Sequence, residues 1–358
     1  MLRFPITLTR TFMRFFRSLI PLSSTTFWIC VASAFLLGNL VTLMLTKIWQ
    51  PFPLSSSIYP KASTEEDEPF EYFVTRVQGH EHVKPLLSVE PVSESSRFAD
   101  LKTNVAGLID SLKKVGMVNQ VSVYLREFEH GEWMVLNETE QFHPASLIKI
   151  PLLLCYLRMA EATPGLLKEK LTFQKPDSIK INTQYYKAPS IEPGRSYTIH
   201  ELLYYMIAYS DNNATWLLAS RFDPSLLKKL FADLGLPEPV PDDMKFTLTA
   251  KNCSVFFKAI YNVAYLSPEY SEYAASMLSN CSFEEGFVKG FPEGTKIWHK
   301  FGEWRSPGHD YELHESGIVH IFGRPYLLTV MTRGKNTEQL AGAINVISKK
   351  TYRSIAAM

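Results

Sequence analysis

The sequence predicts an α+β domain over residues 96–358, in which a five-stranded antiparallel sheet is flanked by the terminal helices and an all-helical lobe is inserted. The hydrophobic pattern indicates, in chain order, a helix, a hairpin, a long helical stretch, three strands and a helix. The hairpin and the three late strands supply the sheet, and the helical stretch between them supplies the lobe. An apolar run of about 20 residues near the N-terminus also predicts a transmembrane helix.

This N-terminal transmembrane helix is predicted at residues 25–49. Residues 27–45 are almost wholly apolar, and the basic tail at 1–24 contains four arginines and no acidic residue. By the positive-inside rule the tail is cytoplasmic, and the chain crosses the plasma (inner) membrane once. A cleaved signal peptide is the alternative. It is disfavoured because the basic region is long and no small-x-small cleavage site follows the apolar run.

Residues 50–95 are predicted to form an extracytoplasmic stalk. They are rich in proline and serine and carry an acidic run at 65–68, so little of this segment can bury a core. We expect extended or disordered chain here, with residues 70–77 as the part that is able to dock on the domain.

The domain elements follow from hydrophobic periodicity. Apolar residues recur at helical spacing in the first and last helices, whereas alternation and a His130-Gly131 turn indicate the hairpin. The chain from 160 to 285 is expected to be mainly helical. The elements are predicted as helices at 98–112, 148–159 and from 336 or 337 to 352, and as strands at 121–128, 132–136, 295–301, 313–322 and 325–332.

A Ser-x-x-Lys motif, Ser146 to Lys149, stands at the start of the very apolar helix. A three-residue step on a helix returns to the same face, so the lysine amine lies beside the hydroxyl. A buried lysine loses its proton readily and then serves as the base that activates a serine nucleophile. The same pattern begins at Ser111 and at Ser225, within amphipathic helices, and we interpret those two occurrences as structural.

Two further motifs each have a structural alternative. Ser210-Asp211-Asn212 precedes a helical run, where such residues commonly cap the helix. Lys300-Phe301-Gly302 falls on the first late strand, where lysine can guard an edge and glycine can form a bulge. Neither motif alone predicts a function.

Taken together and in this order, the three motifs resemble the signature of class A β-lactamases and penicillin-binding proteins. The resemblance covers residues from about 96 to 358, including the order of helices and strands. It extends to the stretch Tyr197–Leu203 and to the helix that begins near Thr249. It implies a β-lactamase-like fold and a membrane-anchored serine hydrolase that forms an acyl-enzyme with β-lactams.

The resemblance also implies roles for the motif residues. Ser146 attacks the carbonyl group of the substrate, and Lys149 takes its proton. Ser210 relays a proton to the leaving nitrogen, and Asn212 holds the substrate amide and helps to fix Lys149.

On the late strand, Lys300 supplies positive charge toward Ser210 and the substrate carboxylate. Gly302 and Glu303 belong to the substrate-binding part of that strand. The backbone N–H groups of Ser146 and Glu303 are expected to form the oxyanion hole, in which one donor is worth roughly 3 kcal/mol of transition-state stabilisation.

One departure from the family pattern is Phe301, which replaces the usual Thr or Ser between Lys300 and Gly302. A phenyl ring cannot hydrogen-bond a substrate carboxylate. Either the carboxylate is held by another group or the substrate lacks one. Arg305 is a candidate substitute, although an ordinary exposed loop arginine is the plainer interpretation.

A second departure is the absence of Glu-x-x-Leu-Asn, whose glutamate activates the hydrolytic water in class A β-lactamases. The corresponding segment is 236–243, where Glu238, Asp242 and Asp243 are the carboxylates. A proline-stiffened surface turn accounts for this segment without catalysis. Acylation without a positioned base for hydrolysis is the behaviour of a penicillin-binding protein.

Composition narrows the remaining possibilities. The net charge of +1 gives no indication of a nucleic-acid partner. The four cysteines show no paired spacing, so neither a disulfide framework nor a zinc site is expected, although one bridge stays open. The histidines on the late strands, His299, His314 and His320, show no metal-binding spacing either. Tyr185 and Tyr186 are assigned to core packing rather than to the cleft wall.

Three hypotheses follow. The first is a monomeric enzyme without cofactor or metal, acting on β-lactams or, alternatively, on D-alanyl peptides of the cell wall. The second is a non-catalytic sensor of β-lactams or peptidoglycan, but the cytoplasmic tail is too short for an ordinary signalling domain. The third is a degenerate structural relative, which the presence of Ser146, Lys149, Ser210, Asn212 and Lys300 disfavours.

Overall fold

The computed structural model describes residues 71–174, 185–240, 246–305 and 308–358. The chain separates into two units, residues 1–68 and 69–358, and only the second contains described residues. The predicted tail, the predicted transmembrane helix and the stalk up to residue 70 therefore lie outside the described residues. Within the described ranges, no helix has both the length and the apolar character needed to cross a bilayer.

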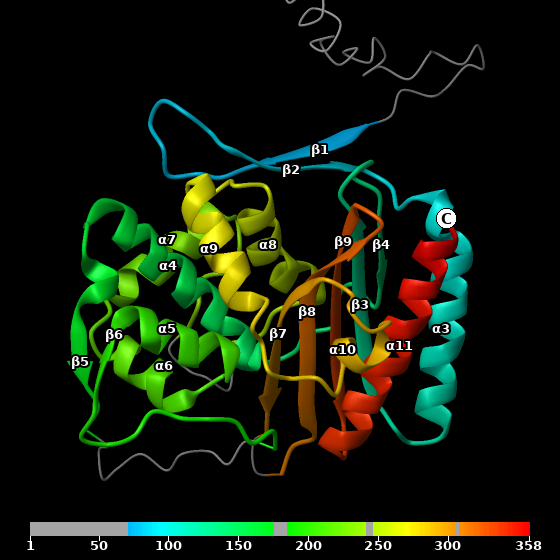
Figure 1. The fold of residues 1–358 in the computed structure, drawn as a ribbon. Helices are drawn as coiled ribbons and strands as arrows, with labels where there is room; N and C mark the ends of the chain where they lie inside the picture. The colour runs from blue at the N-terminus through cyan, green and yellow to red at the C-terminus, as the bar shows by residue number, and fades with distance from the viewer. Residues whose placement is uncertain (1–70, 175–184, 241–245, 306–307) are drawn as a thin grey trace, which may run out of the picture. The chain divides into compact units, whose positions relative to one another are not determined.

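A five-stranded antiparallel sheet runs through the domain, as predicted (Figure 1). Its strand order is β4-β3-β9-β8-β7, so the hairpin forms one edge and the first late strand the other. The three late strands differ from the predicted bounds by one to three residues at each end, and β9 shows the largest extension, because pairing with its neighbours continues beyond its apolar stretch. The strands are β3 (Gln120–Glu127), β4 (Trp133–Leu136), β7 (Ile297–Trp304), β8 (Tyr311–Ile321) and β9 (Arg324–Gly334).

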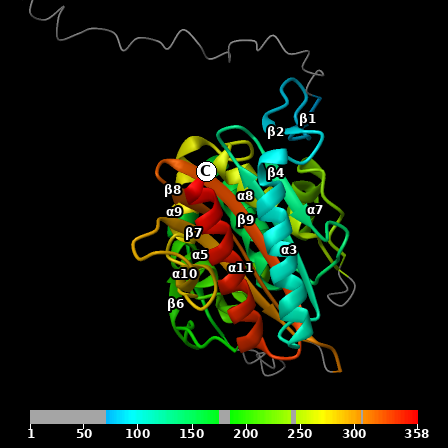
Figure 2. The ribbon, with the colours of Figure 1, turned by 90° about the vertical axis from the view of Figure 1, so that its right-hand side faces the viewer.

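The two terminal helices cover one face of this sheet. Helices α3 (Ala99–Lys114) and α11 (Thr337–Ala357) pack on each other and on the sheet, as Figure 2 shows. Alternate residues of β3 face opposite cores: Val123 and Leu125 join the terminal helices, whereas Tyr124 joins the helical lobe. The sheet is thus buried on both faces, so apolar residues of β3 are enclosed whichever way they point.

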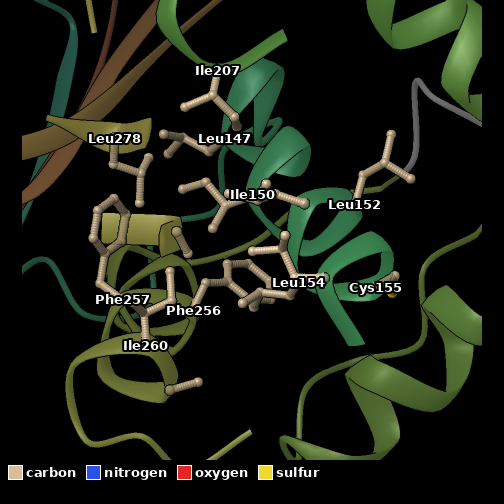
Figure 3. Close-up of a cluster of buried hydrophobic side chains, with 14 of the residues drawn as sticks. Leu147, Ile150, Leu152, Leu154, Cys155, Ile207, Phe256, Phe257, Ile260 and Leu278 are labelled. Atoms are coloured by element: carbon tan, nitrogen blue, oxygen red, sulfur yellow. The ribbon is translucent and has the colours of Figure 1, made fainter. Parts of the chain in front are cut away.

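The helical lobe covers the other face, as predicted, and α4 (Lys149–Ala162) runs through its centre. Most α4 side chains are buried, and Figure 3 shows Ile150 and Leu154 close to Phe256 and Phe257 of α8. A helix that is apolar all round must be enclosed by others. The other elements of the lobe are β5 (Lys170–Thr172), β6 (Ser196–Thr198), α5 (Ile199–Ala208), α6 (Asn212–Ala219), α7 (Pro224–Asp233), α8 (Ala250–Tyr261), α9 (Pro268–Leu278) and, after it, α10 (Phe287–Gly290).

The described part of the predicted stalk is not simply extended chain. It forms an antiparallel hairpin of β1 (Tyr72–Arg76) and β2 (Leu86–Pro91). The buried Glu90 carboxylate of β2 lies 2.6 Å from an Arg126 guanidinium nitrogen and 2.8 Å from Lys258 Nζ. The expectation of extended chain is therefore corrected for residues 72–91, because this ion pair and the buried Leu87 tie β2 to the domain.

Three of the four cysteines are described, and Cys155, Cys253 and Cys281 are all free and buried. Ser111 and Ser225, from the other two Ser-x-x-Lys occurrences, make local contacts. Their hydroxyls bond to the Gly107 carbonyl in α3 and to the capping carboxylate of Asp223. These contacts agree with the structural interpretation of both.

Candidate active site

The structure brings Ser146 and Lys149 together at the entrance to α4. Ser146 lies in a short 3-10 turn, η2 (Ala145–Ile148), and Lys149 is the first residue of α4. Side chains three residues apart eclipse in a 3-10 turn, so the Ser-x-x-Lys spacing still aligns the two. The difference from the predicted α-helical start at residue 148 is therefore immaterial to the motif.

The Lys149 ammonium group is held by oxygen atoms from the second motif. Its Nζ atom donates to Asn212 Oδ1 at 2.8 Å, to the Ser210 carbonyl at 2.5 Å and to Ser210 Oγ at 3.2 Å. These three acceptors come from the junction between α5 and α6, more than 60 residues along the chain. The Lys149 amine is therefore oriented by uncharged oxygen acceptors, namely a backbone carbonyl, a hydroxyl and an amide oxygen.

Burial lowers the pKa of Lys149 well below its ordinary value, because a charged amine loses its hydration there. The like charge of Lys300 lowers it further, whereas the carboxylates of Asp211 and Glu303 act in the opposite direction. A lowered lysine pKa favours the neutral amine, which is the form able to accept a proton.

Asp211, between Ser210 and Asn212, caps helix α6. Its carboxylate accepts the backbone N–H groups of Asn213 and Ala214, and it also accepts the Ser190 hydroxyl at 2.7 Å. The capping interpretation of Ser-Asp-Asn is thus correct for Asp211. The same cap turns its neighbours toward Lys149, so capping and site formation are two results of one local structure.

The third motif lies on β7, whose free edge meets the η2 turn. A Cβ atom on Gly302 would lie 2.8 Å from the Ser146 backbone nitrogen and 3.0 Å from that of Leu147. Atoms of a side chain do not approach so closely, so only glycine permits this contact between strand and turn. The contact sets the predicted oxyanion-hole donor, the Ser146 N–H, against the strand that carries Glu303.

Lys300 is fully buried, and its Nζ donates to the Phe301 carbonyl at 2.8 Å. Burial lowers the pKa of Lys300 to about 8, against the opposing effects of Cys281, Glu303 and Glu315. The charge of Lys300 is also one of the causes that lower the pKa of Lys149.

The Phe301 side chain packs in the core beneath the terminal helices, and its ring centroid lies 4.2 Å from Lys300 Nζ. Its ring stacks on Phe283 at a centroid distance of 4.4 Å and meets Tyr186 edge to face at 5.7 Å. Arg305 is exposed, but it also lines the cavity beside Ser146, where its guanidinium lies 4.2 Å from the Tyr311 ring centroid. Arg305 is thus exposed, as the plainer interpretation states, and its role toward a substrate carboxylate stays a prediction.

A network of polar contacts fixes the chain that enters the nucleophile turn. The backbone N–H of His143 donates to Glu312 Oε2 at 2.8 Å, and the His143 carbonyl lies 2.9 Å from His314 Nε2. Arg333 holds Glu312 from the other side at 2.7 Å. Ala145 adopts φ +51°, a left-handed conformation that costs a non-glycine residue on the order of 1–3 kcal/mol. This network holds that strained residue directly before Ser146.

Ser146 and Lys149 line a cavity of about 700 Å³. Glu303, which was predicted as a substrate-binding residue, and Tyr185, which was assigned to the core, also border it. The Tyr185 backbone N–H donates to Glu303 Oε1 at 2.8 Å, while Glu303 Oε2 is buried with no hydrogen-bond partner among the described residues. Burial raises the pKa of Glu303, partly offset by this N–H bond and by Lys300 and Lys149. The assignment of Tyr185 to the core was wrong, whereas Tyr186 packs as expected.

No local sequence signal indicates that Tyr185 belongs to this wall. Glu303, in contrast, was predicted from its position directly after Lys-x-Gly. The segment 236–243 contributes no described residue to the cavity lining. Glu238 is exposed and forms an ion pair with Lys228 at 2.7 Å, and Asp242 and Asp243 lie outside the described residues.

Residues 102–355 match the family profile Beta-lactamase2, described as a beta-lactamase enzyme family. The chain belongs to the β-lactamase enzyme family. Membership confirms the predicted family and the prediction that the chain is a β-lactamase-like serine hydrolase.

Solved structures support the same fold for this β-lactamase family member. A mutant of PBP-A in an acyl-enzyme complex with penicillin G is 20% identical, covers 72% of this chain and 98% of its own, and has a TM-score of 0.59. A β-lactamase from Sphaerobacter thermophilus is 20% identical, covers 72% of this chain and 98% of its own, and has a TM-score of 0.60. A class A β-lactamase from Mycobacterium abscessus is 18% identical, covers 71% of this chain and 98% of its own, and has a TM-score of 0.59. A search of curated proteins gives no significant match.

Proposed function

We propose that this β-lactamase family member forms an acyl-enzyme on Ser146 with β-lactams and that it releases the product slowly. The observation that carries the proposal is the buried Lys149 amine, with its lowered pKa, held by Ser210 and Asn212 in the cavity of Ser146. A neutral amine there is a base for the serine proton. Such positioned bases contribute roughly 10²- to 10⁴-fold to a rate.

In the acylation step, the Ser146 hydroxyl oxygen forms a bond to the lactam carbonyl carbon while its proton passes to Lys149. The backbone N–H groups of Ser146 and Glu303 receive the developing negative charge on the carbonyl oxygen. The C–N bond then breaks, and the Ser210 hydroxyl donates a proton to the leaving nitrogen and recovers one from Lys149. Lys300 supplies positive charge, and Asn212 holds the amide side chain of the substrate.

Slow release follows from the carboxylates that are available. Glu238, the described candidate in the segment 236–243, points to solvent and pairs with Lys228. No described residue of that segment lines the cavity, and burial raises the pKa of the Glu303 carboxylate that does line it, which disfavours the ionised form needed for a base. We infer that the acyl-enzyme therefore hydrolyses slowly. Phe301 leaves the substrate carboxylate without a hydroxyl partner, and Arg305 on the cavity wall is the group we assign to it.

A D-alanyl peptidase or transpeptidase of cell-wall metabolism is the second candidate, because it uses the same acylation step and tolerates slow transfer to water. A non-catalytic sensor requires none of the proton-accepting character of Lys149. We therefore place it third.

The test is a time course of intact mass after the full-length protein is mixed with a penicillin, with Ser146→Ala as the matched control. We expect an adduct on the wild type that persists for many minutes and no adduct on the variant. Rapid loss of the adduct with consumption of the drug would instead indicate efficient β-lactamase activity. If neither protein forms an adduct or consumes the drug, the β-lactam proposal is wrong.

We further propose that residues 25–49 anchor the enzyme in the plasma (inner) membrane as a single pass, with the domain extracytoplasmic. The apolar run and the four preceding arginines support this orientation. Protease added to intact cells should digest the domain and spare a tag at the N-terminus. Recovery of the protein in the wash after alkaline carbonate treatment of membranes would contradict the anchor.

A further inference from the structure

A second cluster of reactive groups lies beside β7, formed by Cys281, His299 and Glu315. All three residues are buried. His299 Nδ1 lies 2.6 Å from Glu315 Oε1, and the other carboxylate oxygen of Glu315 accepts the Phe287 backbone N–H at 2.9 Å. The carboxylate is therefore fixed and sets the orientation of the imidazole ring. Cys281 and His299 line the same cavity, and each group influences the ionisation of the other.

This order of groups, thiol to imidazole to carboxylate, is the arrangement that activates a cysteine nucleophile. Burial alone would raise the pKa of Cys281, but the His299 ring, the charge of Lys300 and the Phe283 N–H outweigh it, and the pKa lies below its ordinary value. Burial alone would lower the pKa of His299, but its contacts with Cys281 and Glu315 raise it to about 10. Thiolate and imidazolium thus stabilise each other.

The two other described cysteines provide a contrast within the same chain. Burial raises the pKa of Cys155 and that of Cys253 to about 12 in each case. Neither is hydrogen-bonded to a histidine among the described residues. Low reactivity is what apolar burial predicts for such thiols.

Cys281 and His299 both line a cavity of about 750 Å³ beside α9 and the start of β7. Among the described residues, none that lines this cavity also lines the cavity of Ser146. Ser279, Lys296 and His320 form part of its wall and contribute polar groups to it. A small uncharged reagent therefore has both the space and a polar surface on which to approach the thiol.

We propose that Cys281, His299 and Glu315 form a second nucleophilic site, separate from Ser146, at which a small peroxide oxidises the Cys281 thiolate. The sulfur forms a bond to one peroxide oxygen while the O–O bond breaks. The leaving hydroxide takes the proton of the His299 imidazolium and departs as water. Cys281 becomes a sulfenic acid, the peroxide is reduced, and His299 is left neutral.

The first experiment measures thiolate character in the full-length protein under native conditions. Iodoacetamide is added for increasing times, the protein is denatured, and the remaining thiols are blocked with isotopically heavy iodoacetamide before peptide mass spectrometry. We expect Cys281 to be alkylated at least about tenfold faster than Cys155 and Cys253. Equal rates at the three thiols, or a slower rate at Cys281, would overturn the proposal.

A second measurement uses hydrogen peroxide followed by dimedone, which tags sulfenic acids. We expect the tag on the Cys281 peptide in the wild type and in Cys253→Ser, and its loss in Cys281→Ser. Its absence from the wild-type Cys281 peptide contradicts the proposed oxidation.

Variants of His299 and Glu315 test whether these two residues cause the reactivity of the Cys281 thiol. In His299→Gln, a reduction of about tenfold in Cys281 alkylation is expected, with Cys155 and Cys253 unchanged. If this variant unfolds, all three thiols become reactive together. Glu315→Gln then replaces it, because its amide oxygen still accepts from the ring and a smaller reduction is expected. An unchanged Cys281 rate in a folded His299→Gln protein would show that the imidazole does not activate the thiol.

Discussion

The Cα of Gly302 on β7 lies so close to the backbone nitrogen of Ser146 that an added Cβ would stand 2.8 Å from it. Two motifs separated by about 150 residues are thereby in direct backbone contact. Because Ser146 N–H is one of the two proposed oxyanion-hole donors, the strand and the nucleophile turn must keep this spacing for the donor to be effective.

Replacing Gly302 with alanine should slow acylation of Ser146 by penicillin by about 10²- to 10³-fold, the typical cost of losing one oxyanion-hole donor. The added methyl group forces β7 away from the turn. The measurement is the rate of adduct formation by intact mass. Gly107→Ala in α3 is the matched control, because nothing lies within 4 Å of its added Cβ. That control should acylate normally and gain about 0.5–1 kcal/mol in unfolding free energy. Normal acylation in Gly302→Ala would mean that the turn does not depend on this contact.

Lys149→Arg should lower the acylation rate by about 10²- to 10⁴-fold, because a guanidinium keeps its proton and cannot act as a base. Lys114→Arg is the control from the Ser-x-x-Lys occurrence in α3 and should acylate at the wild-type rate. Both rates are measured by rapid quench and mass spectrometry. Comparable rates for Lys149→Arg and the wild type would require a different base.

Glu303→Gln should shift the pH dependence of acylation. The Glu303 carboxylate favours the charged form of Lys149, so its neutralisation lowers the pKa of Lys149 further. Since the neutral amine is the active form, the rising acid limb of the rate profile should move to lower pH. Glu338→Gln, on the same cavity wall, is the control and should leave that limb in place. A shift to higher pH in Glu303→Gln would contradict this electrostatic relationship.

Glu90→Gln should reduce the free energy of unfolding by about 3–5 kcal/mol, because Arg126 and Lys258 are left buried without their counter-charge. Chemical denaturation of the full-length protein measures it. The exposed Glu81 of the same segment provides the control Glu81→Gln, which should change stability by no more than about 0.5 kcal/mol.

The ion pairs of Glu90 with Arg126 and Lys258 should also make the free energy of unfolding depend on pH. Burial opposes ionisation of Glu90, but Lys258 and Arg126 outweigh it and hold the pKa of the folded state below the ordinary value. The contribution of Glu90 is therefore present above the pKa of the unfolded chain and is lost as pH falls through the folded-state pKa. Acid unfolding of the wild type should be steeper in this range than that of Glu90→Gln. Parallel curves would indicate that the ion pair does not couple to folding.

The sequence by itself determined the order of elements and the three motifs, because periodicity and residue identity are local properties of the chain. The alternating pattern of the hairpin and late strands indicated the sheet, and the apolar run after Ser146 indicated an enclosed helix. Asp211 was correctly placed at a helix start for the same reason. The membrane anchor is a sequence prediction of this kind, and the described residues do not test it.

Only the tertiary structure decided how distant segments meet. The hydrogen bonds from Lys149 to Ser210 and Asn212 join residues more than 60 positions apart, and the contact of Gly302 with Ser146 spans a longer interval. Phe301 points into the core because Phe283 and Tyr186 receive it, which no local pattern indicates. The docking of β2 similarly depends on one carboxylate whose cationic partners come from β3 and α8. Packing and electrostatic contacts between remote side chains depend on three-dimensional proximity, which periodicity does not encode.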